Sequence, residues 1–227
     1  MKSNLWTRIF ISTLVVVAGA AFAVHKEIQA EVKDMESAKN SRYEEATFAG
    51  GCFWCMQPPF DSLSGVVETV VGYSGGTEEN PTYEQVWQGK TGHAEAIKVI
   101  YDPAKTNYET LLETFWINID PTQVDGQFAD RGRHYRTAIF YHDNSQKEKA
   151  LLSKKKLDES GKFKKPVVTS VEKFVSFYRA EEYHQKYYEK NPIHYGNYKI
   201  GSGRAGFIER TWGKQGLQCH GEPLGLT

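Results

Sequence analysis

The chain has 227 residues, enough for one sizeable domain with a well-buried core. Its 28 Lys and Arg residues balance its 28 Asp and Glu residues, so no excess of charge points to a nucleic-acid partner. Three cysteines, an odd number, do not make a disulfide framework.

The first 23 residues have the pattern of a targeting segment. Lys2 and Arg8 precede an apolar run from Ile9 to Val24, and Ala21-Phe22-Ala23 resembles a cleavage site. The run is short for a membrane-spanning helix, which needs about 20 apolar residues. We therefore expect residues 1–23 to be a signal peptide, or an N-terminal membrane anchor if they are retained, and the protein to be extracytoplasmic.

Residues 24–43 are polar and weakly patterned, which predicts a linker before a folded domain at 44–213. Within that domain, periodicity and turn residues predict strands at Thr47–Ala49, Val66–Tyr73, His93–Tyr101, Tyr135–Tyr141 and Val167–Val171. They predict helices at Trp54–Leu63, with its regular part on one side of Pro58-Pro59, at Asn107–Ile119, from a Ser145-x-x-Glu148 capping box to Gly161, and at Ala180–Lys190 before Pro192.

These elements alternate without a strict βαβ rhythm. The pattern favours an α+β fold, a two-layer sandwich with a mixed sheet and a ferredoxin-like core. Residues 214–227 are polar and rich in glycine, so we expect a flexible tail that could carry Cys219 to a site elsewhere on the domain.

The sequence Gly50-Gly51-Cys52-Phe53-Trp54-Cys55 is the strongest chemical signal. Two glycines leave Cys52 open at the mouth of the following helix, where the helix dipole favours a thiolate, the nucleophilic form of cysteine. Phe53 and Trp54 are large aromatics suited to line a pocket. Cys55 is close enough to trap an oxidised Cys52, so the motif predicts a redox-active site.

Two other interpretations of the cysteines stay open. The first is a Cys₃His zinc site in a non-catalytic binding domain, with Cys52, Cys55, Cys219 and His220 as ligands. Structural zinc sites usually take their ligands from two closely spaced pairs, each on its own turn. A thioredoxin-like dithiol–disulfide oxidoreductase also uses C-x-x-C. It should reduce insulin disulfides without needing Glu95.

Glu95 begins an alternating strand and shares a face with Ile97, Val99 and Tyr101. On an apolar face its pKa should rise, which would let it act as a general acid. A strand-end glutamate exposed at the rim of the sheet is the alternative.

Polar side chains in glycine- and proline-rich connections could bind a polar oxygen, although most such residues only pack at the surface. They are Tyr83, Gln127, Asp130 and Tyr135. Further along, His184 and Tyr187 lie about one turn apart, and packing is the simpler role for both.

Several separated motifs, in order, resemble peptide methionine sulfoxide reductase A. They are Gly51-Cys52-Phe53-Trp54, Asn80-Pro81-Thr82-Tyr83, Thr91-Gly92-His93-Ala94-Glu95-Ala96, Asp130-x-Gly132-x-x-Tyr135-Arg136 and Gly201-Ser202-Gly203-Arg204-Ala205-Gly206-Phe207. The resemblance covers about residues 44 to 213. It implies thiol-dependent reduction of methionine-(S)-sulfoxide, free or in proteins, in a two-layer α+β sandwich. It implies no cofactor, no metal and no nucleic acid. A monomer reduced by a thioredoxin-like dithiol is expected.

Carried onto this sequence, the resemblance implies a nucleophile at Cys52 and an aromatic cage at Phe53 and Trp54. It implies hydrogen bonds to the sulfoxide oxygen from Tyr83, Glu95 and Tyr135, and a polar pocket residue at Asp130. The family often has glycine where this chain has Cys55. Cys55 and Cys219 are therefore competing candidates to resolve an oxidised Cys52.

Overall fold

The computed structural model describes residue 25 and residues 42–217, with side chains as far as residue 213. The strands are β1 (Glu44–Gly50), β2 (Val66–Ser74), β3 (Ala94–Tyr101), β4 (Gly126–Gln127), β5 (Asp130–Arg131), β6 (Thr137–Tyr141), β7 (Ser170–Lys173) and β8 (Phe177–Arg179). The α-helices are α2 (Phe53–Asp61), α3 (Tyr83–Trp87), α4 (Tyr108–Ile117), α5 (Asn144–Glu159), α6 (Tyr187–Lys190), α7 (Pro192–Gly201) and α8 (Arg204–Leu217), and 3₁₀ turns span Arg133–Tyr135 and Glu182–His184.

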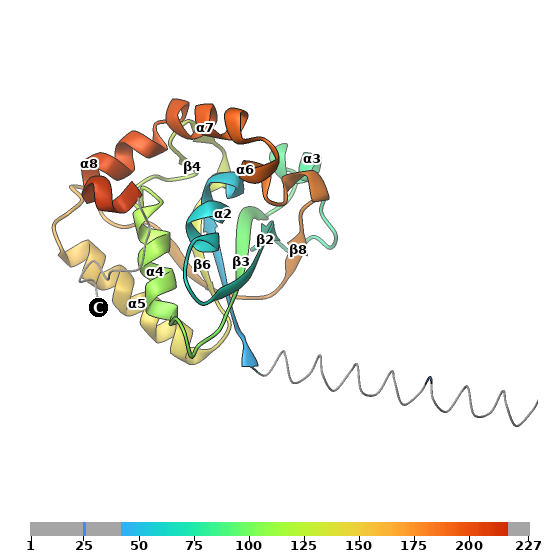
Figure 1. Ribbon diagram of the computed structural model, residues 1–227, viewed down its shortest axis with the longest axis horizontal. Helices are drawn as coiled ribbons and strands as arrows, with labels where there is room; N and C mark the ends of the chain where they lie inside the picture. The colour runs from blue at the N-terminus through green and yellow to red at the C-terminus, as the bar shows by residue number, and fades with distance from the viewer. Residues whose placement is uncertain (1–24, 26–41, 218–227) are drawn as a thin grey trace, which may run out of the picture. The chain divides into compact units, whose positions relative to one another are not determined.

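Six strands form one mixed sheet in the order β7-β6-β1-β3-β2-β8, visible in the middle of the domain in Figure 1. β1 pairs antiparallel with β3 and β6, and β2 pairs antiparallel with β3 and β8. β6 and β7 are parallel. The α+β class and the mixed sheet are confirmed. β4 and β5 pair separately.

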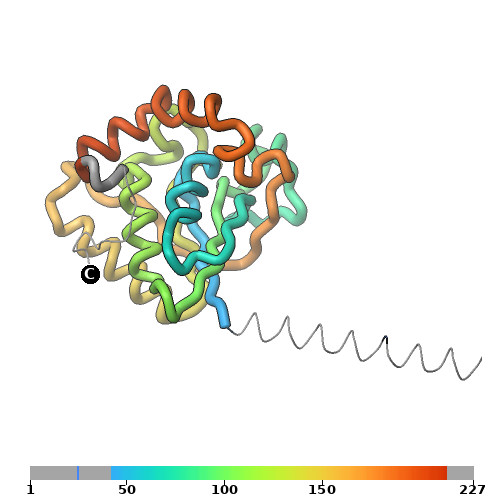
Figure 2. The backbone as a smooth tube through the Cα atoms, in the orientation of Figure 1, coloured from blue at the N-terminus to red at the C-terminus, as the bar shows by residue number. Residues whose placement is uncertain are grey.

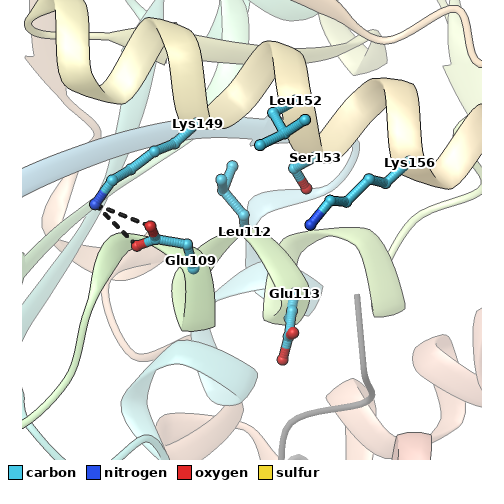
Figure 3. A pocket seen from close by; sticks show the side chains of 7 residues that line it. All are labelled: Glu109, Leu112, Glu113, Lys149, Leu152, Ser153 and Lys156. Atoms are coloured by element: carbon cyan, nitrogen blue, oxygen red, sulfur yellow. Dashed lines mark hydrogen bonds and ion pairs between the residues drawn. The ribbon is translucent and has the colours of Figure 1, made fainter. Parts of the chain in front are cut away.

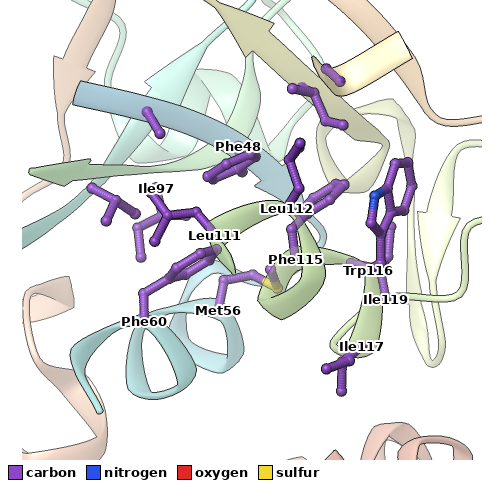
Figure 4. Packing of buried hydrophobic residues seen from close by; sticks show 14 of the residues in the cluster. Phe48, Met56, Phe60, Ile97, Leu111, Leu112, Phe115, Trp116, Ile117 and Ile119 are labelled. Carbon is purple, nitrogen blue, oxygen red and sulfur yellow. The ribbon is translucent and has the colours of Figure 1, made fainter. Parts of the chain in front are cut away.

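The main core lies between the sheet and the helices α2, α4, α5 and α8 (Figure 4). Phe48 of β1 is at its centre, where its ring stacks on Phe60 of α2 and Phe115 of α4 at centroid distances of 5.4 and 5.2 Å. Burial of each such ring contributes about 1.5–3 kcal/mol. The core therefore fixes α2, and the cysteines on it, against the sheet.

The opposite face of the sheet has small residues. Ala49, Ala96 and Ala138 are buried there beside Phe140, and Phe174 and Phe177 pack against them. Alternation along each strand sends odd and even positions to opposite faces. Glu95 consequently lies on the helix-covered face, one position from Ala96.

Helix α2 differs from the prediction because it runs through Pro58 and Pro59. Each proline removes a backbone donor, yet its fixed φ is compatible with a helix. Met56 and Phe60 on the same helix are fully buried. This packing holds α2 helical in spite of the lost hydrogen bonds.

The predicted helix at Ala180–Lys190 is also wrong. Lys186 has a left-handed φ of 52° and separates a 3₁₀ turn from the short α6. Its N–H donates to Gln57 Oε1 at 2.8 Å and its ammonium pairs with Asp61, so tertiary contacts fix the break. Pro192 begins α7 instead of only ending a helix, as its missing donor allows at a first position.

The C-terminal helices pass over the N-terminal end of α2 (Figure 2), where Trp54 contacts Tyr187 of α6 and Tyr198 of α7. α8 continues beyond the predicted end of the domain to Leu217, with non-helical dihedrals at Gly213. Cys219 and the rest of the predicted tail lie outside the described residues.

Candidate active site

A cavity of about 100 Å³ opens beside the N-terminal end of α2. Its lining comes from segments far apart in the sequence: Cys52, Phe53, Trp54, Tyr83, Glu95, Asp130, Tyr135 and Tyr198. All of these except Tyr198 were singled out from the sequence. The fold therefore brings the separated motifs to one place.

Gly51 determines how the chain enters this cavity. Its φ is 78°, and a Cβ there would lie 2.5 Å from the side chain of Gln127. Only glycine accommodates both constraints. The turn leaves Cys52 as the residue just before α2, with its side chain only 5 % exposed.

Cys52 and Cys55 face each other across one turn. The Cys55 N–H donates to the Cys52 carbonyl at 3.0 Å, and the two thiols are hydrogen-bonded. Burial raises the pKa of Cys52 well above its usual value, with Cys55 and Glu95 adding to the rise. The prediction of a lowered pKa at Cys52 is wrong, because desolvation outweighs the helix N-terminus. The hydrogen bond from Cys52 lowers the pKa of Cys55.

Glu95 is buried in the cavity wall, 2 % exposed. Burial raises its pKa to about 8, although the Phe53 N–H, which donates to Glu95 Oε2 at 3.0 Å, acts in the opposite direction. At neutral pH the carboxyl group therefore holds a proton. The alternative of an exposed glutamate at the rim of the sheet is wrong.

Tyr83 and Tyr135 present two hydroxyl groups to the same cavity. Burial raises the pKa of both, with the charge of Glu95 as the next influence, so both remain protonated donors. Glu181 holds the backbone of Tyr83, because the Tyr83 N–H donates to Glu181 Oε1 at 3.0 Å. The other oxygen of Glu181 accepts from the hydroxyl of Tyr73 at 2.7 Å.

Tyr198 of α7 was missed by the sequence analysis, which predicted no element after Pro192. Its hydroxyl donates to Asp130 Oδ2 at 2.5 Å and hydrogen-bonds to the thiol of Cys52, where it lowers the pKa. The clustering of tyrosines between residues 187 and 198 was a signal for aromatic packing around the site. It did not single out Tyr198.

The aromatic wall is built around Trp54. Its ring stacks on Tyr187 at 3.8 Å and 7°, and its indole N–H donates to His184 Nδ1 at 3.0 Å. His184 is buried, and that burial lowers its pKa to about 4, so it is neutral at pH 7. His184 and Tyr187 thus pack and orient Trp54, in agreement with a packing role.

Two sequence candidates, Gln127 and Cys55, are described but do not line the cavity. Gln127 is buried outside the lining, and its amide hydrogen-bonds to the backbone of Asp120. Cys55 is buried beside Cys52 and does not line the cavity. Cys219 and His220, on which the zinc interpretation depends, lie outside the described residues. Within the described part, no three His, Cys, Asp or Glu side chains are grouped to hold a metal ion.

A second cavity, of about 60 Å³, lies between α4 and α5 (Figure 3). Lys149 donates to Glu109 across it at 3.0 Å, and Leu112 and Leu152 supply its apolar surface. Its lining includes no thiol. The redox chemistry predicted from the sequence thus belongs to the first cavity.

The sequence model of the family described as peptide methionine sulfoxide reductase matches residues 44–216. The chain belongs to this family. It is 56 % identical over 173 residues to peptide methionine sulfoxide reductase MsrA of Bacillus velezensis and 57 % identical over 174 residues to that of Bacillus subtilis. These matches span 76 % and 77 % of this chain and 98 % of each relative.

Solved structures give the same family. Reduced Mxr1 from Saccharomyces cerevisiae matches with a TM-score of 0.61 and 31 % identity, over 67 % of this chain and 88 % of that one. Methionine sulfoxide reductase A of Corynebacterium diphtheriae matches with a TM-score of 0.60 and 32 % identity, over 67 % of this chain and 76 % of that one. Membership of this reductase family replaces the thioredoxin-like and zinc-domain alternatives.

The prediction of an extracytoplasmic protein, exported or anchored by its N-terminal hydrophobic segment, is wrong on these comparisons. The Bacillus relatives are matched over 98 % of their own length within about three quarters of this chain, so they have almost no residues left to match an N-terminal segment. Among the described residues, no helix is both long and apolar enough to cross a membrane. Residues 1–24, on which the prediction rested, lie outside the described part.

Proposed function

We infer that this protein reduces methionine-(S)-sulfoxide, in proteins and as the free amino acid, to methionine with its own thiols as reductant. One observation carries the proposal. A single small cavity combines the thiol of Cys52, the protonated carboxyl of Glu95 and the hydroxyls of Tyr83 and Tyr135. Family membership supplies the substrate class.

The cavity has an apolar side and a polar side that suit a methyl sulfoxide. Phe53 and Trp54 offer aromatic surface to the substrate methyl group. Tyr83, Glu95 and Tyr135 offer O–H donors to the sulfoxide oxygen, and Asp130, held by Tyr198, adds a polar wall. These roles are consistent with burial and with the protonation states described above.

In the proposed reaction, Cys52 rests as a thiol because of its raised pKa, loses its proton to solvent and attacks the sulfoxide sulfur while Glu95 gives its proton to the oxygen. The substrate S–O bond and the transient bond between the two sulfurs then break as the oxygen forms a new bond to the Cys52 sulfur, which becomes a sulfenic acid. Methionine leaves with the electron pair gained by its sulfur, and Glu95 is left as a carboxylate. The substrate sulfur is reduced by two electrons and the Cys52 sulfur is oxidised by two.

A second thiol then closes the cycle. We propose that Cys55 resolves the sulfenic acid first, supported by its hydrogen bond to Cys52. Cys219, which lies outside the described residues, acts second in the proposal and draws the disulfide outward. A thioredoxin-type dithiol resets the enzyme by exchange.

A single-turnover assay without a recycling reductant tests the activity. The wild type should release one equivalent of methionine from the S epimer and none from the R epimer. Cys52→Ser should release none. Cys219→Ser is the matched control, because it also removes one thiol but should keep the first turnover. Methionine formed by Cys52→Ser would exclude Cys52 as the nucleophile.

The organisation of the chain is part of the proposal. We propose a catalytic domain at residues 44–213 after a linker at 24–43, supported by a family match that begins at residue 44. A ferredoxin-like core is supported by the succession β1-α2-β2-β3-α4-β6 and the strand order β6-β1-β3-β2. A monomeric enzyme is supported by a cavity lined from one chain.

A further inference from the structure

Arg204, near the start of α8, places its guanidinium group behind the cysteine-bearing turn. The residue is 1 % exposed. Its Nη2 donates to the Gly50 carbonyl at 3.0 Å, and its Nη1 donates to the Asn118 carbonyl and contacts Met56 Sδ at 3.4 Å. The ring of Phe128 covers it at 4.7 Å. A cation is therefore held inside the protein by backbone carbonyls, a thioether and an aromatic ring.

This cation has no carboxylate partner among the described residues. A buried charge without an opposite charge is strongly disfavoured, and carbonyl dipoles offset only part of that penalty. Arg204 contacts Gly50, two residues before Cys52, and Met56, the residue after Cys55. The cysteine pair is thus the neighbouring group that can supply a compensating negative charge.

We propose that Arg204 is a positioning residue that stabilises the thiolate of Cys55 and so prepares Cys55 to attack the sulfenic acid of Cys52. The inference rests on the proposed function of Cys55. In this step Cys55 loses its proton, its sulfur forms the S–S bond with Cys52, and the S–O bond of the sulfenic acid breaks. The hydroxide that leaves takes up a proton and becomes water, so the cysteines gain a disulfide and no other reactant is needed.

Other charged groups also act on Cys55. The hydrogen bond from Cys52 is the largest influence on the pKa of Cys55 and lowers it, burial and Asp130 of β5 raise it, and Arg204 and Lys199 of α7 lower it. Cys55 in turn raises the pKa of Glu95 of β3. Lys199 is partly exposed, so solvent and salt screen its charge. Arg204 is the buried cation, and its influence should persist at high salt.

The test measures the titration of Cys55 alone, in the full-length chain with Cys52→Ser and Cys219→Ser. The rate of alkylation by iodoacetamide is followed against pH, because only the thiolate reacts. Arg204→Gln, which keeps a hydrogen-bond donor, and Arg204→Met should both move the midpoint upward by about 1–2 pH units. Arg204→Lys retains the charge, so its midpoint should stay close to that of the chain with Arg204. Arg210→Met removes an exposed cation from the same helix and should leave the midpoint unchanged.

An unchanged midpoint in folded Arg204→Gln or Arg204→Met overturns the proposal. So does a rise in Arg204→Lys as large as in the neutral variants, which would mean that packing rather than charge sets the titration. If the neutral variants do not fold, a rise of about 1–2 pH units in folded Arg204→Lys, which keeps the charge, overturns the proposal instead. The assay contains no substrate, so its result is separate from the proposed function. Failure of Cys55 to resolve Cys52 is detected instead by mapping the first disulfide in Cys55→Ser.

Discussion

Glu95 gains its chemical role from its surroundings. The carboxyl group is buried on the helix-covered face of β3 and its pKa is raised to about 8. Glu95→Gln keeps a donor of similar shape but cannot release a proton. We expect single-turnover methionine formation to fall about 10²–10⁴-fold, as for loss of general acid catalysis. Rates close to wild type between pH 6 and pH 9 would exclude the acid role.

The raised pKa of Glu95 also affects stability. Because the folded-state pKa lies above the unfolded value of 4.5, the folded protein binds the proton more tightly, and the stabilisation is fully present only below pH 4.5. It is lost as the pH rises through about 8, by a few kcal/mol in the free energy of unfolding. Urea unfolding at pH 5 and pH 9 should show this loss in the wild type and a smaller one in Glu95→Gln. An equal loss in both proteins would contradict it.

Tyr198 connects Asp130 to the reactive sulfur. Its hydroxyl lowers the pKa of Cys52 by a hydrogen bond, in opposition to burial. In Tyr198→Phe the ring remains beside Trp54 while that bond is lost. We expect the pH profile of the first turnover to move upward by about one unit and the rate at pH 7 to fall about tenfold. Tyr195→Phe on the same helix is the control, and an equal shift there would assign the effect to α7 as a whole.

The cavity residues were predictable because each belongs to a short motif with distinctive chemistry. Cys52 follows two glycines, and Glu95 stands on an apolar strand face. Tyr198 has no such local signal, since its role depends on how α7 is placed over α2. The pKa of Cys52 was predicted in the wrong direction for a related reason, because the extent of burial is a property of the assembled fold.

At the level of the element, the start of α5 separates two capping hypotheses. The sequence suggested a capping box at Ser145, but the side chain of Asp143 accepts the Gln146 N–H at 2.8 Å. Asp143→Ala should cost about 1 kcal/mol of unfolding free energy. Ser145→Ala, the matched control, should change it by less than about 0.5 kcal/mol. Denaturant unfolding of both variants distinguishes the two hypotheses. A larger loss of unfolding free energy in Ser145→Ala than in Asp143→Ala would support the capping box at Ser145.

Strands and the amphipathic α4 were predictable because hydrophobic periodicity reports directly which face is buried. The C-terminal third was not, because its local signals conflict with tertiary contacts. Lys186 takes a left-handed conformation, and Gln57 satisfies its N–H. The sequence predicted that Pro192 ends the preceding helix, whereas in the structure it is the first residue of α7. At Lys186 the contacts with Gln57 and Asp61 of α2 decide the conformation.

At the level of the whole molecule, the open question is the order in which two thiols serve one sulfenic acid. Cys55 lies one turn from Cys52 and is already hydrogen-bonded to it, whereas Cys219 lies outside the described residues. A Cys52–Cys55 bond closes a very small ring, which favours rapid exchange with an outside thiol. A Cys52–Cys219 bond closes a much longer loop of the sequence, and closing a longer loop costs more entropy. Resolution by Cys55 should therefore come first.

Peptide mapping after one turnover tests this order. Cys219→Ser should release methionine normally and contain a Cys52–Cys55 disulfide, while its steady-state turnover with a dithiol protein falls. Cys55→Ser should accumulate the sulfenic acid of Cys52, detectable by a sulfenic-acid-specific probe, before any bond to Cys219 forms. If Cys55→Ser instead forms Cys52–Cys219 as fast as the wild type forms its first disulfide, then Cys219 resolves directly. Cys55, buried in the turn that Arg204 contacts through Gly50 and Met56, would then serve only the later exchange.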